Sequence, residues 1–248
     1  MLLHKVCAIC LAFPISLSQK RLTKNLRICT SLVSLCFLSI QGVAFSLHVA
    51  AEYPKAPECS AFAEKSKAVM EEWYPKINDI LFGSAHPLPA ESITLVCEPM
   101  QVIAYSDIEK NRIHISSAFV AAHPLDYGTV VHELTHIVQH YAKLKREGVW
   151  LQEGIADYIR HQYYERDMEA MALAVDPDHD SYRKGYRVAA AFLSWVEKQN
   201  TSAIQDLNRG CAQGHCAADL FVGVCGKDVD LLWAEFASDL RKRKLPSQ

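Results

Sequence analysis

Two histidines with a glutamate between them form the segment of this chain best suited to chemistry. Residues 127–139 are expected to form a helix that carries His132, Glu133 and His136. Because residues four apart share one face of a helix, both imidazoles can direct a ring nitrogen at one zinc ion. Glu133 faces the same open side, where it can accept a proton from a metal-bound water.

A third ligand is predicted further along the chain. A catalytic zinc site takes three protein ligands and leaves the fourth position for water. Glu153 follows His136 by 17 residues, an interval in which one helix can end and a second can return, so it is predicted as that ligand. Asp157 lies one helical turn after Glu153. It is predicted to accept a hydrogen bond from the outer ring nitrogen of a zinc-bound histidine.

Other ligand sets are less favourable. His140 continues the face of His132 and His136, but about 12 Å of helix separates it from His132, too far for both to bind one ion easily. A metzincin would place a third histidine where this chain has Ala142. His140 is therefore expected to be exposed or packed. The alternative for Glu153 and Asp157 is a solvated helix face.

Three segments around these residues resemble the basic secretory protein family, secreted proteins best known from plants and assigned to gluzincin-type metallopeptidases. They are residues 131–139, 150–160 and 185–195, and residues 226–233 resemble the closing helix of the family. The resemblance covers most of residues 58–240. It implies a zincin-like fold, zinc on His132, His136 and Glu153, and Glu133 as the catalytic base. Residues 150–154 also echo gluzincin aminopeptidases, whose Gly-Ala-Met-Glu-Asn segment this sequence lacks.

Tyr186 belongs to a Gly-Tyr pair that the family resemblance places before a helix. A phenol beside the zinc could donate a hydrogen bond to the oxyanion of a tetrahedral intermediate, so Tyr186 is predicted as a second catalytic residue. The alternative is a packed aromatic side chain at the start of a helix.

The charge distribution separates an N-terminal leader from the rest of the chain. Of the 26 Lys and Arg residues, five lie in residues 1–51, which contain no Asp or Glu; the 28 acidic residues therefore face 21 basic ones after residue 51, a net charge of −7. An acidic body disfavours nucleic acid as a partner. Residues 20–27 are basic, residues 28–47 are uncharged, and small residues at 42–44 and 49–51 offer cleavage sites. The alternative is a retained signal anchor.

Cysteine usage is consistent with export. Four of the nine cysteines lie in the leader, and the remainder are Cys59, Cys97, Cys211, Cys216 and Cys225. A Cys59–Cys97 pair would tie the first expected helix to the first expected strand, and two of the last three could close a small C-terminal loop. The connectivity stays open at this point. Metal binding by these thiols is disfavoured because no pair among the five has C-x-x-C spacing.

The expected elements form an α+β, zincin-like domain over residues 52–248, after a leader at residues 1–51. It begins with a helix at 60–81 and a small mixed sheet from strands at 93–97, 101–105 and 112–116, the last forming the edge of the cleft. A mainly helical part follows the active-site helix. The expected helices span residues 128–143, 152–164, 182–198 and 228–241, and residues 168–180 are expected to form a loop.

These observations predict a secreted, monomeric, zinc-dependent peptidase that acts on peptide or protein substrates and contacts a membrane only if the leader is retained. One alternative is a catalytically silent secreted binding or defence protein in which zinc has only a structural role. The presence of Glu133 argues against it, because a purely structural site needs no base. A membrane-tethered form of the same peptidase is the other alternative.

Overall fold

The computed structural model describes residues 47–244, so residues 1–46 of the expected leader lie outside the described residues. A four-stranded sheet opens the described part. Its strands are β1 (His48–Glu52), β2 (Ser92–Glu98), β3 (Ala104–Asp107) and β4 (Arg112–Ser116). The strand order is β1-β2-β4-β3, with β3 antiparallel to β4 and the other pairs parallel. The sheet is therefore small and mixed, as expected.

The edge of this sheet is not the strand predicted from the sequence. Residues 112–116 form β4, which lies between β2 and β3, so the edge strands are β1 and β3. The polar and apolar residues of β4 alternate because only one face is covered by helices: Ile113 and Ile115 are fully buried there. On the opposite face, His114 stacks on Tyr105 with ring centroids 4.5 Å apart. β3 also begins three residues later than predicted, at Ala104.

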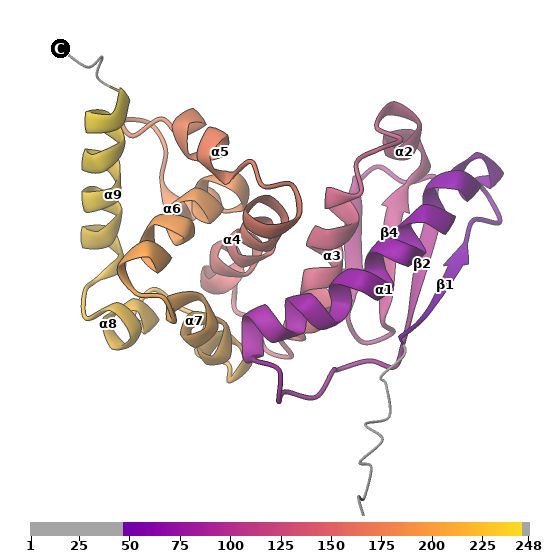
Figure 1. The fold of residues 1–248 in the computed structure, drawn as a ribbon, viewed down its shortest axis with the longest axis horizontal. Coiled ribbons are helices and arrows are strands. Elements are labelled where there is room, and N and C mark those ends of the chain that lie inside the picture. Colours follow the sequence, from indigo (N-terminus) through magenta and orange to yellow (C-terminus); the bar gives the residue numbers. More distant parts are fainter. Residues whose placement is uncertain (1–46, 245–248) are drawn as a thin grey trace, which may run out of the picture. The chain divides into compact units, whose positions relative to one another are not determined.

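Two helices cover the buried face of the sheet (Figure 1). They are α1 (Ser60–Phe82) and α3 (Gly128–Gln139). The buried side of α1 includes Met70, Tyr74 and Ile77, at the i, i+4, i+7 spacing of an amphipathic helix. A disulfide from Cys59 to Cys97 joins the residue before α1 to β2, as the sequence suggested.

The second half of the described chain is helical. Its helices are α4 (Val149–Ile159), α5 (Met168–Ala174), α6 (Tyr186–Gln199), α7 (Ala203–Ala212), α8 (Leu220–Cys225) and α9 (Val229–Lys244). Short helical segments connect the parts: η1 (Pro57–Cys59), α2 (Ser117–Ala122), η2 (Arg146–Gly148), η3 (Arg160–Tyr164) and η4 (Tyr182–Lys184). Aromatic side chains fill this half, among them Tyr182, Phe192, Phe221 and Phe236.

Three expected elements differ from the structure. The helix at 128–143 ends at Gln139, because His140 adopts a left-handed backbone conformation with φ 42°. The helix at 152–164 continues beyond α4 as the π-helical turn η3. The expected loop at 168–180 contains α5, whose residues Met168, Met171 and Ala172 repeat at helical spacing and are buried. No helix within residues 47–244 is both long enough and apolar enough for a membrane span.

Candidate active site

The helix α3 is the central element of the site, and it is buried along its whole length. The Asp126 carboxylate accepts a hydrogen bond from the Thr129 amide at the start of the helix, 3.0 Å away. Arg160 donates to Asp126 at 2.9 Å and to Glu165 at 2.7 Å, so it joins η3 to the same end of α3. This network fixes α3 against the elements that follow α4.

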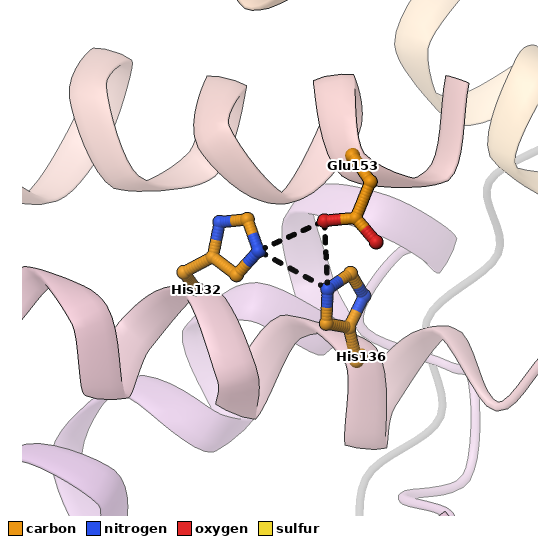
Figure 2. Close-up of side chains that lie close together, drawn as sticks. All are labelled: His132, His136 and Glu153. Carbon is orange, nitrogen blue, oxygen red and sulfur yellow. Dashed lines mark hydrogen bonds and ion pairs between the residues drawn. The ribbon is translucent and has the colours of Figure 1, made fainter. Parts of the chain in front are cut away.

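His132, His136 and Glu153 meet between α3 and α4 (Figure 2). The Nε2 atoms of the two histidines are 3.1 Å apart, and they lie 3.2 Å and 3.4 Å from Glu153 Oε2. A tetrahedral zinc ion with ligands at about 2.0–2.1 Å separates its ligand atoms by roughly 3.3 Å. The three donors, two imidazole nitrogens and one carboxylate oxygen, therefore fit a zinc ion in both type and spacing.

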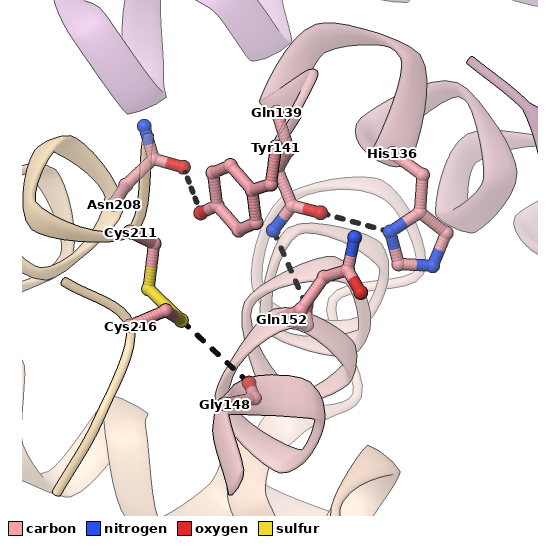
Figure 3. The surroundings of a disulfide bond; sticks show 8 residues. All are labelled: His136, Gln139, Tyr141, Gly148, Gln152, Asn208, Cys211 and Cys216. Atoms are coloured by element: carbon pink, nitrogen blue, oxygen red, sulfur yellow. Dashed lines mark hydrogen bonds between the residues drawn. A yellow bond between two sulfur atoms is a disulfide. The ribbon is translucent and has the colours of Figure 1, made fainter. Parts of the chain in front are cut away.

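The outer nitrogens of both histidines are occupied. Nδ1 of His132 donates to Asp157 Oδ1 at 2.6 Å, the contact that the sequence predicted. Nδ1 of His136 donates to Gln139 Oε1 at 2.8 Å, and the amide of Gln139 donates to the Gln152 carbonyl (Figure 3). Both tautomers are thereby fixed with Nε2 free to bind metal. Gln139 was missed by the sequence reasoning, although its i+3 spacing from His136 was a usable signal.

The charges around these nitrogens favour a cation. Burial by itself lowers the pKa of His132, but Asp157 and Glu153 more than offset it and raise this pKa to about 10. Burial would raise the pKa of Glu153, but hydrogen bonds from His132 and His136 lower it to about 2. The carboxylates thus stabilise positive charge between the histidines, which is the charge that a divalent ion supplies.

Glu133 is 7% exposed and lies on the same buried helix. Its carboxylate Oε2 accepts a hydrogen bond from Ser106 Oγ, 2.8 Å away, and its main-chain oxygen lies 2.7 Å from the same hydroxyl. Ser106 belongs to β3, the edge strand that lines the cavity. It was not identified from the sequence, because the pairing of β3 with β4 and its contact with α3 are tertiary features.

Tyr186 begins α6 in a strained backbone conformation with φ 46°, directly after Gly185 with φ 69°. The residue is 55% exposed, and its ring stacks over the His132 ring with centroids 6.2 Å apart. The charge of Glu153, followed by burial, raises the pKa of Tyr186 above its usual value, so the phenol keeps its proton. A non-glycine residue with positive φ is uncommon and often marks a functional position.

The three possible zinc ligands line one cavity of about 1050 Å³ together with Glu133 and Tyr186. One wall comes from β3 and the residues before it, and the opposite wall comes from α4 and the start of α6. Its apolar wall includes Val102, Ile103, Tyr105 and Phe119. A cavity of this size can hold several residues of an extended peptide.

Two other histidines lie outside the group of His132, His136 and Glu153, although His161 lines the same cavity. His140 is exposed at the end of α3 and is not among the cavity residues. His161 donates from Nδ1 toward Asp167 at 2.8 Å and lies 3.1 Å from Glu165. His161, Glu165 and Asp167 form a second group of possible metal ligands. Because Glu165 already pairs with Arg160, ion pairing explains why these side chains lie close together.

Comparisons with known proteins identify a family and a fold for this chain. A family described as "Peptidase of plants and bacteria", abbreviated BSP, matches residues 42–236 and confirms the resemblance found in the sequence. An M1 zinc metallopeptidase from Deinococcus radiodurans superposes with a TM-score of 0.52 at 19% identity, covering 82% of this chain and 50% of that one. A point mutant of that enzyme gives 0.52 at 18% identity, with 82% and 51% covered.

The chain spans about half the length of these solved structures. At this level of identity the likeness concerns the fold, and it confirms the expected zincin-like α+β class. No curated protein matches the sequence.

Proposed function

The chain belongs to the BSP family, the peptidases of plants and bacteria, and from that membership we propose that it is an exported zinc-dependent peptidase. His132, His136 and Glu153 would hold the ion, with Asp157 and Gln139 orienting the two imidazoles. The observation that carries the proposal is the convergence of two imidazole nitrogens and one carboxylate oxygen at 3.1–3.4 Å inside a large cavity.

The protein side chains have separate roles in the proposed reaction. A zinc ion bound here would polarise the substrate carbonyl and acidify a water molecule. Glu133 accepts the proton of that water as it attacks the peptide carbon, and it then donates the proton to the departing amine nitrogen. Tyr186 donates its phenolic proton in a hydrogen bond to the carbonyl oxygen as negative charge develops there.

Export is supported by the two disulfides in the described part of the chain, Cys59–Cys97 and Cys211–Cys216. Disulfides persist in oxidising compartments and are rare in the cytosol of mesophiles. Cys225 carries a free thiol. Extracellular or periplasmic peptides and proteins are therefore the proposed substrates.

Glu133→Gln tests the proposed reaction. The substituted amide keeps the shape of the side chain but cannot accept a proton, so peptide hydrolysis should fall by at least about a hundredfold. Zinc content should stay at about one ion per chain, because Glu133 is not a proposed ligand. Both are measured on purified protein, by hydrolysis of a peptide library and by metal analysis.

Glu147→Gln is the matched control, because it makes the same change in a side chain that is 63% exposed at the surface. It should retain wild-type turnover. Hydrolysis of no peptide by zinc-loaded wild type would contradict the peptidase proposal and favour a silent zinc-containing binding protein. Full activity in Glu133→Gln would contradict the role of the base.

A further inference from the structure

Ser106 contacts the proposed catalytic base from a different element of the fold. We propose that Ser106 is a positioning residue for peptide hydrolysis, whose hydroxyl holds the Glu133 carboxylate in the orientation that the reaction needs. This inference rests on the proposed peptidase function. It adds to that function a residue of the edge strand that neither the sequence reasoning nor the family description identifies.

The sheet register explains why Ser106 points toward α3. Ser106 pairs with Ile113 of β4, and Ile113 is fully buried beneath the helices. Side chains of directly paired residues lie on the same face of a sheet. The neighbouring residue Tyr105 pairs with His114 and stacks on it at the other face. The hairpin of β3 and β4 therefore fixes the direction of the Ser106 hydroxyl.

A single hydroxyl reaches both the side chain and the main chain of Glu133. Ser106 Oγ lies 2.8 Å from Oε2 and 2.7 Å from the main-chain oxygen. A glutamate side chain has three rotatable bonds, and within residues 47–244 Ser106 is the one hydrogen-bond partner of this carboxylate. The contact therefore restrains a carboxylate that would otherwise sample several rotamers in the cavity.

The contact also distinguishes the two carboxylate oxygens. Oε2 shares the single Ser106 hydroxyl proton with the main-chain oxygen of Glu133, whereas Oε1 has no hydrogen-bond partner within residues 47–244 and is the oxygen better placed to accept the proton of the attacking water. A general base acts only when it lies within hydrogen-bond reach of the proton that it removes. Small displacements of such a group reduce the rate sharply, by up to about a hundredfold for 1 Å.

Ser106→Ala tests this role. It should lower kcat by about ten- to a hundredfold and change KM by less than about twofold, because the hydroxyl acts in the chemical step rather than in substrate binding. Ser106→Thr keeps a hydroxyl in a β-branched residue suited to strands and should restore most of the lost kcat. Zinc content should be unchanged in both variants.

Ser66→Ala is the matched control. Ser66 is a fully buried serine of α1 whose Oγ donates to the Phe62 carbonyl at 2.8 Å, and it is not among the cavity residues. Ser66→Ala removes a hydroxyl, as Ser106→Ala does, and should leave kcat at the wild-type value. Equal kcat losses in Ser66→Ala and Ser106→Ala, or no loss in Ser106→Ala, would overturn the inference.

A double-mutant cycle in metal-free protein provides a measurement that does not depend on turnover. The cycle compares the effect of Ser106→Ala on the equilibrium constant for unfolding in two backgrounds, wild type and Glu133→Ala. The increase should be about fivefold larger in the wild-type background, because only there does Ser106→Ala remove a contact with the Glu133 carboxylate. Equal effects in both backgrounds would overturn the inference while leaving the peptidase proposal intact. Absence of any peptide hydrolysis by wild type would overturn both together.

Discussion

The two histidines of the site are supported by unlike partners. Asp157 carries a full negative charge at Nδ1 of His132, whereas Gln139 offers a neutral amide oxygen to Nδ1 of His136. A charged acceptor strengthens the hydrogen bond and makes the ring a better electron donor. His132 is therefore expected to bind metal more strongly than His136, and Asp157 to contribute more than Gln139.

Asp157→Asn should weaken zinc affinity by roughly 10- to 100-fold without unfolding the protein. The amide keeps the size of the side chain but removes the charge that supports His132. Competition titration against a chelator of known affinity measures the change, and circular dichroism checks the fold. His140→Ala, an exposed change outside the cluster, is the control and should retain wild-type affinity. Wild-type affinity in Asp157→Asn would leave Asp157 as a solvated or packing residue.

At the scale of elements, the site depends on how closely α4 approaches α6. Gly154 follows the proposed ligand Glu153, and a Cβ added there would lie 2.6 Å from the Cβ of Ala189 in α6. The absence of a side chain at Gly154 allows the two helices to pack at this distance. The same approach brings Glu153 to the histidines of α3 and places Tyr186 in the lining of the cavity.

Gly154→Ala should therefore destabilise the protein by about 1–3 kcal/mol, the usual cost of overpacking. Because α4 must move away from α6, zinc affinity should fall as well. Gly223→Ala in α8 is the matched control: an added Cβ meets no atom within 4 Å there, and alanine is the better helix former. Urea unfolding and zinc titration compare the two. Similar stability of both variants would mean that α4 and α6 can separate freely.

At the scale of the whole molecule, each half of the described chain contains one disulfide. Cys59–Cys97 joins the region of α1 to β2. Cys211–Cys216 lies beside Gly148, just before α4 (Figure 3). A Cβ added at Gly148 would lie 2.3 Å from the Cys216 carbonyl oxygen. Reduction of the second disulfide would thus loosen the segment that leads into the proposed ligand Glu153.

The first strand also bears on the export proposal. β1 (His48–Glu52) pairs with β2 from His48 to Glu52, and Val49 is only 3% exposed. Cleavage after Ala51 would remove four of the five strand residues, whereas cleavage after Ala44 would leave β1 whole. We therefore expect the exported protein to begin near residue 45, at the earlier of the two small-residue sites.

N-terminal sequencing of the protein from its native source measures this position. A mature chain that begins at residue 52 would mean that the sheet functions without β1. An intact leader recovered with the membrane fraction would instead establish the signal-anchored form.

The local sequence was sufficient to predict which side chains converge at the proposed site. His132, Glu133 and His136 lie within one helix, so 3.6-residue periodicity alone places them on one side. Glu153 and Asp157 follow the same rule within α4, and their meeting with the histidines required only that the second helix return to the first. The helix at 60–81 was equally clear because its apolar spacing is regular and long.

The tertiary structure alone decided the contacts between elements that lie apart in sequence or differ in type. Ser106 reaches Glu133 only because β3 turns back on β4 and lies beside α3, and no local pattern encodes that register. The edge strand was assigned wrongly because alternation reports which face is buried, not which strand lacks a neighbour. Gln139 was within reach of local rules, yet its role depends on the rotamer that Gln152 fixes across the helix pair. Periodicity along one helix or strand is a short-range property, whereas pairing, packing distance and hydrogen-bond partners are set by the whole fold.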